Sequence, residues 1–547
     1  TIPNLIKESV EKFADQNSLV FSGEKKYTYR ELGTDIEKVA SLLSVLGVAK
    51  GDKVAVLSTN MPNWGVSFLA ISILGAVAVP ILPDFHENEI KTIIEHSEAK
   101  VIFVSAGLYP NLSEEAKKLV EHIILVDTFA IVPENSMVDE LLNIPVSLPE
   151  KALQNIWAEV EEEDLASIIY TSGTTGNSKG VMLTHLNLAW TTQQCATLQV
   201  VKPTDRLLSV LPLSHTLENT VGFLLPLKFG ASIHYLRKPP VPSVLLPAFQ
   251  EVKPTIMLSV PLIIEKVFRA KIYPEFQKSA LVSKLYSIAF FRKILHKVAA
   301  KKLHKTFGGH LHFFGIGGAK LDPAVERFLM EGGFPYAIGY GLTETSPLLA
   351  GAVGKNRKQG STGIAMEGVQ LRIANADPLT GEGEIQAKGL NVMRGYYKAP
   401  EITKEVFTED GWFKTGDRGC FDKDNKLYIK GRIKTMIVGA SGENIYPEEI
   451  ESVINKMRFV MESLVIEKKG KLVAMIHLNM EEIEQNYKHM KTGAQQYIQD
   501  KSDEILKEIQ KKVNEEVNKF SRIQQVILQP IPFEKTPTKK IKRFLYA

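Results

Sequence analysis

The chain lacks several features that mark whole classes of protein. Its 547 residues include only two cysteines, Cys195 and Cys420, which lie far apart in the sequence. A disulfide framework and a CxxC metal site are therefore excluded, and this cysteine usage fits a reducing compartment. No uninterrupted apolar run is long enough to span a bilayer. The first residues, 1–5, lack the basic and apolar regions of a signal peptide, so we expect a cytoplasmic protein.

The chain also lacks a strong charge of either sign. Its formal net charge is +4, with 23% charged and 44% hydrophobic residues. This composition is ordinary for a globular protein and gives no reason to expect nucleic acid as a partner. A single hydrophobic core does not extend over a chain of this length, so we expect at least two domains.

Several enzyme signatures are missing as well. A Walker A motif needs Gly directly before its Lys and Ser or Thr after it, whereas Ser178 precedes Lys179 and Gly180 follows it. The HRD and DFG motifs of kinases and the G-x-S-x-G elbow of serine hydrolases are absent. A Rossmann fingerprint fails at 315–320, because Lys320 stands where the third Gly would be required.

A polar loop at 171–180 is the most informative stretch that is present. It reads Thr-Ser-Gly-Thr-Thr-Gly-Asn-Ser-Lys-Gly and separates two apolar runs, 165–170 and 181–183, that we expect to be buried strands. Its glycines let the backbone approach a ligand closely, and its hydroxyls, N–H groups and Lys179 suit a polyphosphate. The simpler alternative is a polar linker between two strands.

Strand and helix patterns alternate on both sides of this loop. Such alternation predicts βαβ units and a largely parallel sheet. The expected strands are 54–57, 75–80, 101–104, 123–126, 207–213, 231–236, 255–260 and 312–319. The expected helices are 5–14, 29–46, 63–74, 87–97, 222–229 and 261–270, and a hairpin-like segment is expected at 19–29.

The remainder of the chain changes character twice. From residue 360 short strands and turns follow one another, which predicts a β subdomain over about 355–432. Glycine and charged residues at 428–434 fit an interdomain hinge, and a basic Lys- and Glu-rich region of domain size follows. We therefore expect an α/β protein with an N-terminal domain at 1–432 and a small, mobile α+β domain at 433–547.

Residues 271–310 carry nine lysines and arginines against one acid, Glu275, with apolar residues interleaved. A basic amphipathic helix can lie on an anionic membrane surface. The alternative is a solvated helical hairpin packed on the main domain.

The loop at 170–180 resembles the phosphate-binding loop of the adenylate-forming superfamily, which includes acyl-CoA synthetases, peptide-synthetase adenylation domains and luciferases. Further motifs agree in the family's order: 312–319, Tyr340-Gly341-Leu342-Thr343-Glu344, Trp412–Asp417, Tyr428–Lys434 and the end at 534–543. The resemblance covers almost the whole chain. The insertion at 271–310 and the stretch 308–321 are closest to long-chain fatty acid–CoA ligases.

The resemblance implies a reaction and a role for each matched residue. The family joins a carboxylic acid to AMP with release of pyrophosphate and then passes the acyl group to a thiol. The implied contacts to the β- and γ-phosphates of ATP come from Thr171, Ser172, Gly173, Thr174, Thr175, Gly176 and Lys179. Around the nucleoside and α-phosphate they come from Gly317, Gly318, Ala319, Tyr340, Gly341, Thr343, Asp417 and Arg432.

The implied catalytic residues are Lys540, Glu344, Thr343 and His215, with Glu344 as the Mg²⁺ ligand. Lys539 competes with Lys540, because it stands where the family more commonly has Gly before the catalytic Lys. Lys434 is the implied hinge, and Gly442 and Glu443 would approach the thiol and its pantetheine after a domain rotation.

The resemblance implies ATP, Mg²⁺ and CoA as cofactor and co-substrates, and a fatty acid as the acid. Acyl carrier protein is the alternative acceptor, and another carboxylic acid is the alternative substrate. A nucleotide-binding module that has lost catalysis is the non-enzyme alternative, against which Glu344, Lys179 and Lys540 argue. We expect a cytoplasmic monomer or homodimer that associates with membranes if residues 271–310 bind lipid.

Overall fold

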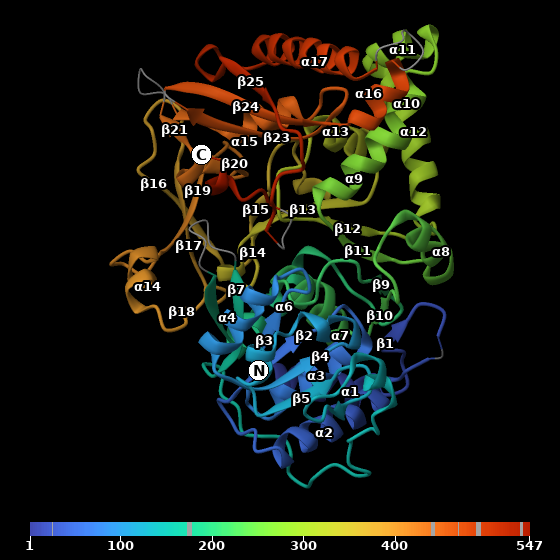
Figure 1. Cartoon of the computed structure of the whole chain (residues 1–547), viewed down its shortest axis with the longest axis vertical. Coiled ribbons are helices and arrows are strands. Elements are labelled where there is room, and N and C mark those ends of the chain that lie inside the picture. Colours follow the sequence, from blue (N-terminus) through green and yellow to red (C-terminus); the bar gives the residue numbers. More distant parts are fainter. Residues whose placement is uncertain are drawn as a thin grey trace.

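The computed structural model describes residues 1–24, 26–171, 178–438, 444–468, 470–487, 494–536 and 540–546 (Figure 1). Two eight-stranded sheets form the larger part of the molecule, and helices pack against them. The first sheet has the order β18-β8-β7-β3-β2-β4-β5-β6, and its four central pairs, from β7 to β5, are parallel. The expectation of a largely parallel sheet is confirmed.

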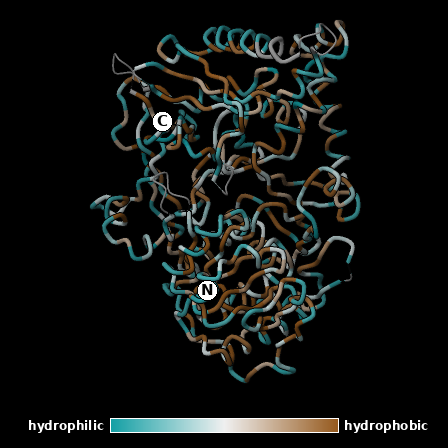
Figure 2. Tube along the Cα trace, viewed as in Figure 1, coloured by the Kyte–Doolittle hydropathy of each residue, from teal (hydrophilic) through white to brown (hydrophobic). Residues whose placement is uncertain are grey.

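The strands of the first sheet are β2 (Lys53–Leu57), β3 (Val77–Ile81), β4 (Ala99–Val104), β5 (His122–Leu125), β6 (Ala130–Ile131), β7 (Leu165–Thr171), β8 (Lys179–Thr184) and β18 (Gly395–Tyr396). All five residues of β3 are buried, as expected of a parallel strand that is covered on both faces. Figure 2 shows hydrophobic residues concentrated in these strands and hydrophilic ones on the surrounding trace.

The second sheet has the order β1-β10-β9-β11-β12-β13-β14-β15 and is parallel as far as β13. Its strands are β1 (Leu19–Phe21), β9 (Arg206–Leu208), β10 (Ser232–Tyr235), β11 (Ile256–Ser259), β12 (Phe313–Ile316), β13 (Tyr336–Gly341), β14 (Leu348–Ala352) and β15 (Ile364–Ala365). The two sheets therefore share one architecture, and both end in antiparallel strands.

Helices cover the sheets and connect their strands. Their bounds are α1 (Ile2–Lys12), α2 (Tyr29–Val45), α3 (Pro62–Ile73), α4 (Glu87–Ser97), α5 (Glu114–Lys117), α6 (His185–Leu198), α7 (Leu225–Lys228), α8 (Pro242–Val252), α9 (Pro261–Val267), α10 (Tyr273–Phe276), α11 (Ala280–Ser287), α12 (Ala289–Thr306), α13 (Pro323–Gly332) and α14 (Pro400–Val406). Local sequence explains several ends: Thr28 and Glu31 form a capping box at the start of α2. Within the described residues, no helix is both long enough and apolar enough to cross a membrane.

A four-stranded antiparallel sheet follows, built from β16 (Gln370–Ala374), β17 (Gly383–Lys388), β19 (Phe413–Phe421) and β20 (Leu427–Arg432). Two short strands of the same region, β15 and β18, belong to the large sheets instead. β15 pairs with β14 in the second large sheet, and β18 pairs with β8 in the first. The small sheet is thus attached to both large sheets by the chain that precedes and interrupts it.

The C-terminal region contains β21 (Ile437–Val438), β22 (Asn444–Ile445), α15 (Pro447–Ile454), β23 (Val460–Lys468), β24 (Lys471–Leu478), α16 (Met480–Tyr487), α17 (Ala494–Glu516) and β25 (Gln525–Leu528). Its buried apolar side chains pack into two clusters whose members all lie after residue 436. In Figure 1 this region, orange to red, lies at the opposite end of the molecule from the first two large-sheet helices α1 and α2. It therefore has cores of its own.

Three expected elements differ from the structure. The segment 19–29 is no hairpin of two strands, because β1 pairs in parallel with β10 and the bridge from Thr28 goes to Asn17, which precedes the segment. The strand expected at 207–213 ends at Leu208. The helix expected at 222–229 starts earlier, as the π-helical turn η3 (Glu218–Leu224), and continues into α7.

The first two differences have separate causes, and each is a hydrogen bond to a residue distant in the sequence. Apolar residues at 211 and 213 are buried by loop packing rather than by a sheet, since Asn60 bonds to this loop in place of a strand neighbour. Polar Ser22 after β1 bonds to Glu251 on α8, so the chain leaves the sheet edge there. Apolar alternation alone does not distinguish these cases.

Candidate active site

The polar loop connects two antiparallel strands. Thr171 at the end of β7 lies opposite Lys179 at the start of β8, so the two described ends of the loop lie side by side. Ser172, Gly173, Thr174, Thr175 and Gly176 lie outside the described residues. The Lys179 ammonium lies 5.0 Å from the centre of the Tyr396 ring, within range of a cation–π contact.

Tyr396 also contacts Glu344. Its hydroxyl donates to Glu344 Oε1 at 2.9 Å, and the Glu344 carbonyl accepts from the N–H of Met393. Glu344 belongs to η5 (Thr343–Thr345), which holds Thr343 next to it. Burial and the neighbouring carboxylate both raise the pKa of Tyr396. The structure therefore brings Lys179, Thr343 and Glu344 together at the loop.

The surroundings of the Glu344 carboxylate limit which divalent metal ion it can bind. In the described part of the chain, no three His, Cys, Asp or Glu residues are grouped so that they could hold a metal ion. Mg²⁺ keeps several waters and is commonly held by one or two carboxylates plus substrate phosphates. Glu344 as a single protein ligand beside a polyphosphate-binding loop suits Mg²⁺ and does not suit zinc.

Asp417 is a buried carboxylate held from two sides. Its side chain accepts a hydrogen bond from the Tyr340 hydroxyl at 2.8 Å and forms an ion pair with Arg432 at 2.8 Å. Asp417 and Arg432 are paired across β19 and β20, so the sheet register fixes their contact. Burial raises the pKa of Asp417, and Arg432 and Tyr340 oppose that shift. A carboxylate can accept about four hydrogen bonds, so it retains acceptor capacity for two hydroxyls.

Glycines stand beside these groups at positions that other residues fit poorly. Gly318 has φ +88°, a backbone conformation that disfavours other residues. A Cβ on Gly341 would lie 1.7 Å from the carbonyl oxygen of Pro347, so only glycine fits. Gly317 and Ala319 flank Gly318 in the loop after β12. Backbone without side chains is thus available next to Tyr340.

Lys540 reaches this site from the C-terminal region. Its N–H donates to Thr536 Oγ1 at 3.1 Å, and its carbonyl accepts from the Thr536 N–H at 2.7 Å. The side chain keeps contact with solvent, yet surrounding protein and Arg432 lower the pKa of its ammonium, while Asp417 and Glu344 oppose the shift. The Lys540 ammonium is therefore near enough to interact electrostatically with all three charged groups. Its rival Lys539 lies outside the described residues.

His215 is influenced by the same ammonium. Burial, followed by the nearby Lys540 charge, lowers the pKa of His215 to about 4. The imidazole is therefore neutral at physiological pH. Its Nδ1 accepts a hydrogen bond from the Leu217 N–H at 3.3 Å, which leaves Nε2 as the protonated nitrogen.

The structure does not show the expected hinge and thiol-site residues in contact with this group. Lys434 lies exposed in η7 (Ile433–Thr435), two residues after Arg432. Gly442 and Glu443 lie outside the described residues.

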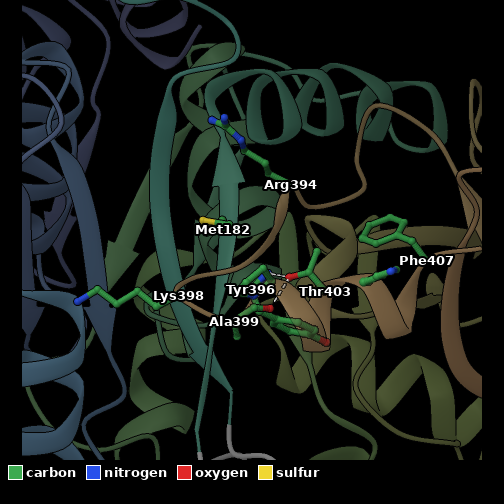
Figure 3. Close-up of a pocket in the computed structure, with 9 residues that line it drawn as sticks. Met182, Arg394, Tyr396, Lys398, Ala399, Thr403 and Phe407 are labelled. Atoms are coloured by element: carbon green, nitrogen blue, oxygen red, sulfur yellow. Dashed lines mark hydrogen bonds between the residues drawn. The ribbon is translucent and has the colours of Figure 1, made fainter.

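A cavity of about 540 Å³ adjoins the site behind Tyr396 (Figure 3). It is lined by Met182, Arg394, Tyr396, Lys398, Ala399, Pro400, Thr403, Lys404 and Phe407. Lys398 points away from it and pairs with Glu98 at 2.8 Å, and the Tyr396 N–H donates to Thr403. The cavity is largely apolar, and Tyr396 separates it from Glu344 and Lys179.

Sequence reasoning missed three residues behind His215. Glu218, Ser209 and Asn60 form a chain of hydrogen bonds, and Glu218 is fully buried. The available signal was a glutamate within an apolar stretch, three residues after the histidine.

The model of one protein family, described as AMP-binding enzyme, matches residues 6–397. The chain belongs to this family. The AMP-binding enzyme is 29% identical to the long-chain-fatty-acid–CoA ligase FadD15 of Mycobacterium bovis, over 95% of this chain and 90% of that one. It is 28% identical to a long-chain-fatty-acid–[acyl-carrier-protein] ligase of Arabidopsis thaliana, over 99% of this chain and 84% of that one.

Solved structures agree with the fold. ATP-bound MatB from Rhodopseudomonas palustris is 25% identical to this AMP-binding enzyme and superposes with a TM-score of 0.76, over 99% of this chain and 98% of that one. The apo form of MatB gives 0.67 with the same coverage. The chain therefore superposes better on the ATP-bound form than on the apo form.

Proposed function

We propose that this AMP-binding enzyme is a long-chain fatty acid–CoA ligase of the AMP-forming type. The observation that carries the proposal is the electrostatic interaction of Lys540 with Glu344, Asp417, Arg432 and His215, which come from well-separated parts of the chain. Relatives named long-chain-fatty-acid–CoA ligases support the substrate class and the acceptor. ATP and CoA are then co-substrates, and Mg²⁺ is the metal.

In the first half-reaction, a carboxylate oxygen of the fatty acid attacks the α-phosphorus of ATP. A new P–O bond forms, the bond to the β-phosphate breaks, and pyrophosphate leaves. Because two anions approach each other, catalysis consists mainly of charge neutralisation and positioning. Lys540 neutralises the α-phosphate and the acid, Thr343 contacts the α-phosphate, and Lys179 with the loop at 171–176 binds the departing phosphates.

A second group of residues binds the nucleoside. Asp417 accepts from the ribose hydroxyls while Arg432 fixes its orientation, and Tyr340, Gly341 and Gly317–Ala319 border the adenine. Mg²⁺ bound by Glu344 would neutralise phosphate charge. His215, as a neutral imidazole, borders the acid carboxyl and donates from Nε2.

In the second half-reaction, a thiolate attacks the acyl carbonyl carbon, a thioester forms and AMP leaves with the electron pair of the broken bond. The thiol proton passes to solvent. The space that Lys540 occupies must then be vacated. We assign residues 1–432 to an N-terminal domain, with a β subdomain at about 355–432, and 433–547 to a domain that rotates about Lys434. Gly442 and Glu443 would then face the thiol.

The insertion α10–α12 supplies a surface for lipid. Its exposed apolar side chains are Leu281, Ile288, Phe290, Phe291, Ile294 and Val298. On α12 the apolar row 290, 294, 298 runs beside the lysine row 293, 297, 301. Its other face packs on α13, where Arg292 and His296 pair with Glu331. We infer peripheral contact with an anionic membrane, made by a monomer or homodimer.

Pyrophosphate–ATP exchange tests the proposal. Exchange that depends on a fatty acid and rises with chain length is expected, and Glu344→Gln should abolish most of it. ADP as the sole nucleotide product would contradict an adenylating enzyme. Assays with CoA and with acyl carrier protein then separate the two acceptors, and a preference for acetate or an aromatic acid would move the enzyme to another branch of the family.

A further inference from the structure

A buried hydrogen-bond chain links the two large sheets behind His215. Asn60, in the loop between β2 and α3, donates from Nδ2 to Ser209 Oγ at 2.9 Å. Ser209, just after β9, donates to Glu218 Oε1 at 2.5 Å. The chain therefore runs from the first sheet, through the second, to the π-helical turn η3.

The same asparagine holds the loop that leads to His215. Its Nδ2 also donates to the carbonyl of Leu211 at 2.6 Å, and its Oδ1 accepts from the N–H of Leu213 at 2.9 Å. His215 follows two residues later, and its carbonyl accepts from the N–H of Asn219 in η3. His215 is thus fixed on one side by Asn60 and on the other by the turn that carries Glu218.

Glu218 sits where an ionised carboxylate is costly. Its side chain is fully buried, and Oε2 has no hydrogen-bond partner within the described protein. No lysine, arginine or histidine in the described part of the chain forms an ion pair with it. An unpaired buried carboxylate costs several kcal/mol, so the group takes up a proton instead.

The fold makes room for this carboxyl group. A Cβ on Gly222, one turn later in η3, would lie 2.7 Å from the Glu218 Cδ, so any larger residue would displace it. Phe223 of the same turn packs edge-on against Trp64 and Phe68 of α3. π-helical turns occur frequently at functional sites. The turn therefore presents Glu218 inward while its aromatic side anchors it to α3.

We propose that Glu218, as a neutral carboxylic acid bonded to Ser209 and through it to Asn60, is a positioning residue for His215 in acyl adenylation. It does not touch the substrate. It keeps the loop 211–215 and the turn η3 in one arrangement, so that the imidazole stays beside Lys540. This inference rests on the proposed function, because His215 matters only if the acid is activated at this site.

Kinetic variants test the neutral state directly. Glu218→Gln replaces the acid with a neutral group of the same shape and should retain adenylation within about threefold. Glu218→Ala should lower kcat for pyrophosphate exchange at least tenfold, with KM for ATP changed less than twofold. Glu326→Ala is the matched control: it removes another buried carboxyl group, on α13, and should lower stability without this loss of kcat.

A double-mutant cycle tests the route through His215. If Glu218 acts by placing the imidazole, Glu218→Ala should add little to the loss already caused by His215→Asn. Fully additive losses would overturn the proposal. So would a Gln variant as slow as the Ala variant, which would require the ionised form. If Glu218→Ala does not fold, Ser209→Ala provides the milder break in the same chain and should lower kcat in the same direction.

The pH dependence of stability tests the protonated state of Glu218 separately from kinetics. Burial raises the pKa of Glu218 to about 8, while Ser209 opposes the shift, and Tyr235 of β10 is the titratable group nearby. The unfolded chain loses this proton first, so wild-type stability should fall relative to Glu218→Gln as pH rises from about 4.5 to 8. Equal Tm differences at pH 5 and pH 8 would contradict a protonated Glu218.

The two levels of failure are distinguishable. If wild-type enzyme shows no fatty-acid-dependent exchange, the proposed function fails. If exchange is normal and Glu218→Ala matches wild type, the positioning role alone fails.

Discussion

At the scale of single residues, backbone hydrogen bonds fix the position of Lys540. Both polar backbone groups of Lys540 bond to Thr536, which fixes where the side chain begins. Lys540→Ala should lower pyrophosphate exchange by about 10²–10³-fold, because one preorganised charge beside the reacting phosphate is lost. Thioester formation from supplied acyl-AMP should change little. Lys542→Ala, two residues away, is the control and should leave both activities intact.

His185 predicts how the protein responds to acid. It is fully buried at the start of α6, its Nδ1 accepts from the Ile2 N–H, and burial lowers its pKa from 6.5 to about 4. Neutral His185 therefore stabilises the fold fully above pH 6.5, and this contribution, about 3 kcal/mol, is lost as pH falls toward 4.

Unfolding at a series of pH values measures this effect. Between pH 6.5 and 4, His185→Gln should lose less stability than wild type, even though its stability at pH 7 is lower. His310→Gln, at an exposed position, is the control. A slope as steep in His185→Gln as in wild type would show that other groups govern the acid response.

At the scale of elements, α11 and α12 carry the proposed lipid surface. Phe290 is 69% exposed and lies beside a row of lysines, so burying it in a lipid headgroup layer is favourable. Phe290→Asp combined with Phe291→Asp should abolish sedimentation with phosphatidylglycerol vesicles and leave turnover of a short-chain acid unchanged. Leu379→Asp, at a residue 96% exposed between β16 and β17, should still sediment. Equal binding of wild type to uncharged phosphatidylcholine vesicles would argue against charge complementarity.

Local signals predicted the elements whose ends are local. The bounds of α4 agree with the expectation to the residue, and α2 differs at its C-terminus by one residue, because caps and glycine set these ends. The strand expected at 207–213 failed because Leu211 and Leu213 are held by Asn60, about 150 positions earlier in the chain. Glu218 was missed for the same reason: its role is visible only with Ser209 and Asn60 beside it.

For the site, too, the sequence predicted single residues but not the contacts between residues distant in the chain. The motifs named Asp417 and Arg432 separately, and only the register of β19 and β20 shows that they pair. The placement of Lys540 among residues some 100 to 300 positions earlier required the whole fold. The types of residue in a motif indicate the chemistry of a site, whereas the distances between these residues depend on tertiary structure.

At the scale of the whole molecule, the proposed mechanism has the C-terminal region placed for the first half-reaction. Contacts across residue 433 hold it there: Lys320 pairs with Glu449, the Tyr446 hydroxyl donates to Glu382, and Arg269 bonds to the Asn455 carbonyl. In the proposed mechanism Lys540 occupies the space that a thiol needs, so we expect the region to turn away afterwards.

Lys434→Pro tests this rotation. Proline restricts φ at the pivot, and the first turn of a helix such as η7 tolerates it. Adenylation should stay within about threefold of wild type, while thioester formation slows by about tenfold or more. Stopped single-turnover assays of each half-reaction measure the two steps, with Lys434→Ala as the control. Equal loss of both steps, or of neither, would place the pivot elsewhere.

The separate cores after residue 436 have a consequence for how the enzyme can be divided. A fragment that carries its own buried clusters is expected to fold when made as a separate chain, and mixing it with residues 1–432 should reconstitute adenylation in trans. The peptide between β20 and β21 then serves as a tether: it keeps Lys540 at an effective concentration in the millimolar range, on the order of that given by short linkers. Activity in trans should therefore equal that of the intact enzyme only at millimolar fragment, and the fragment concentration at which the two activities match measures what the covalent connection contributes.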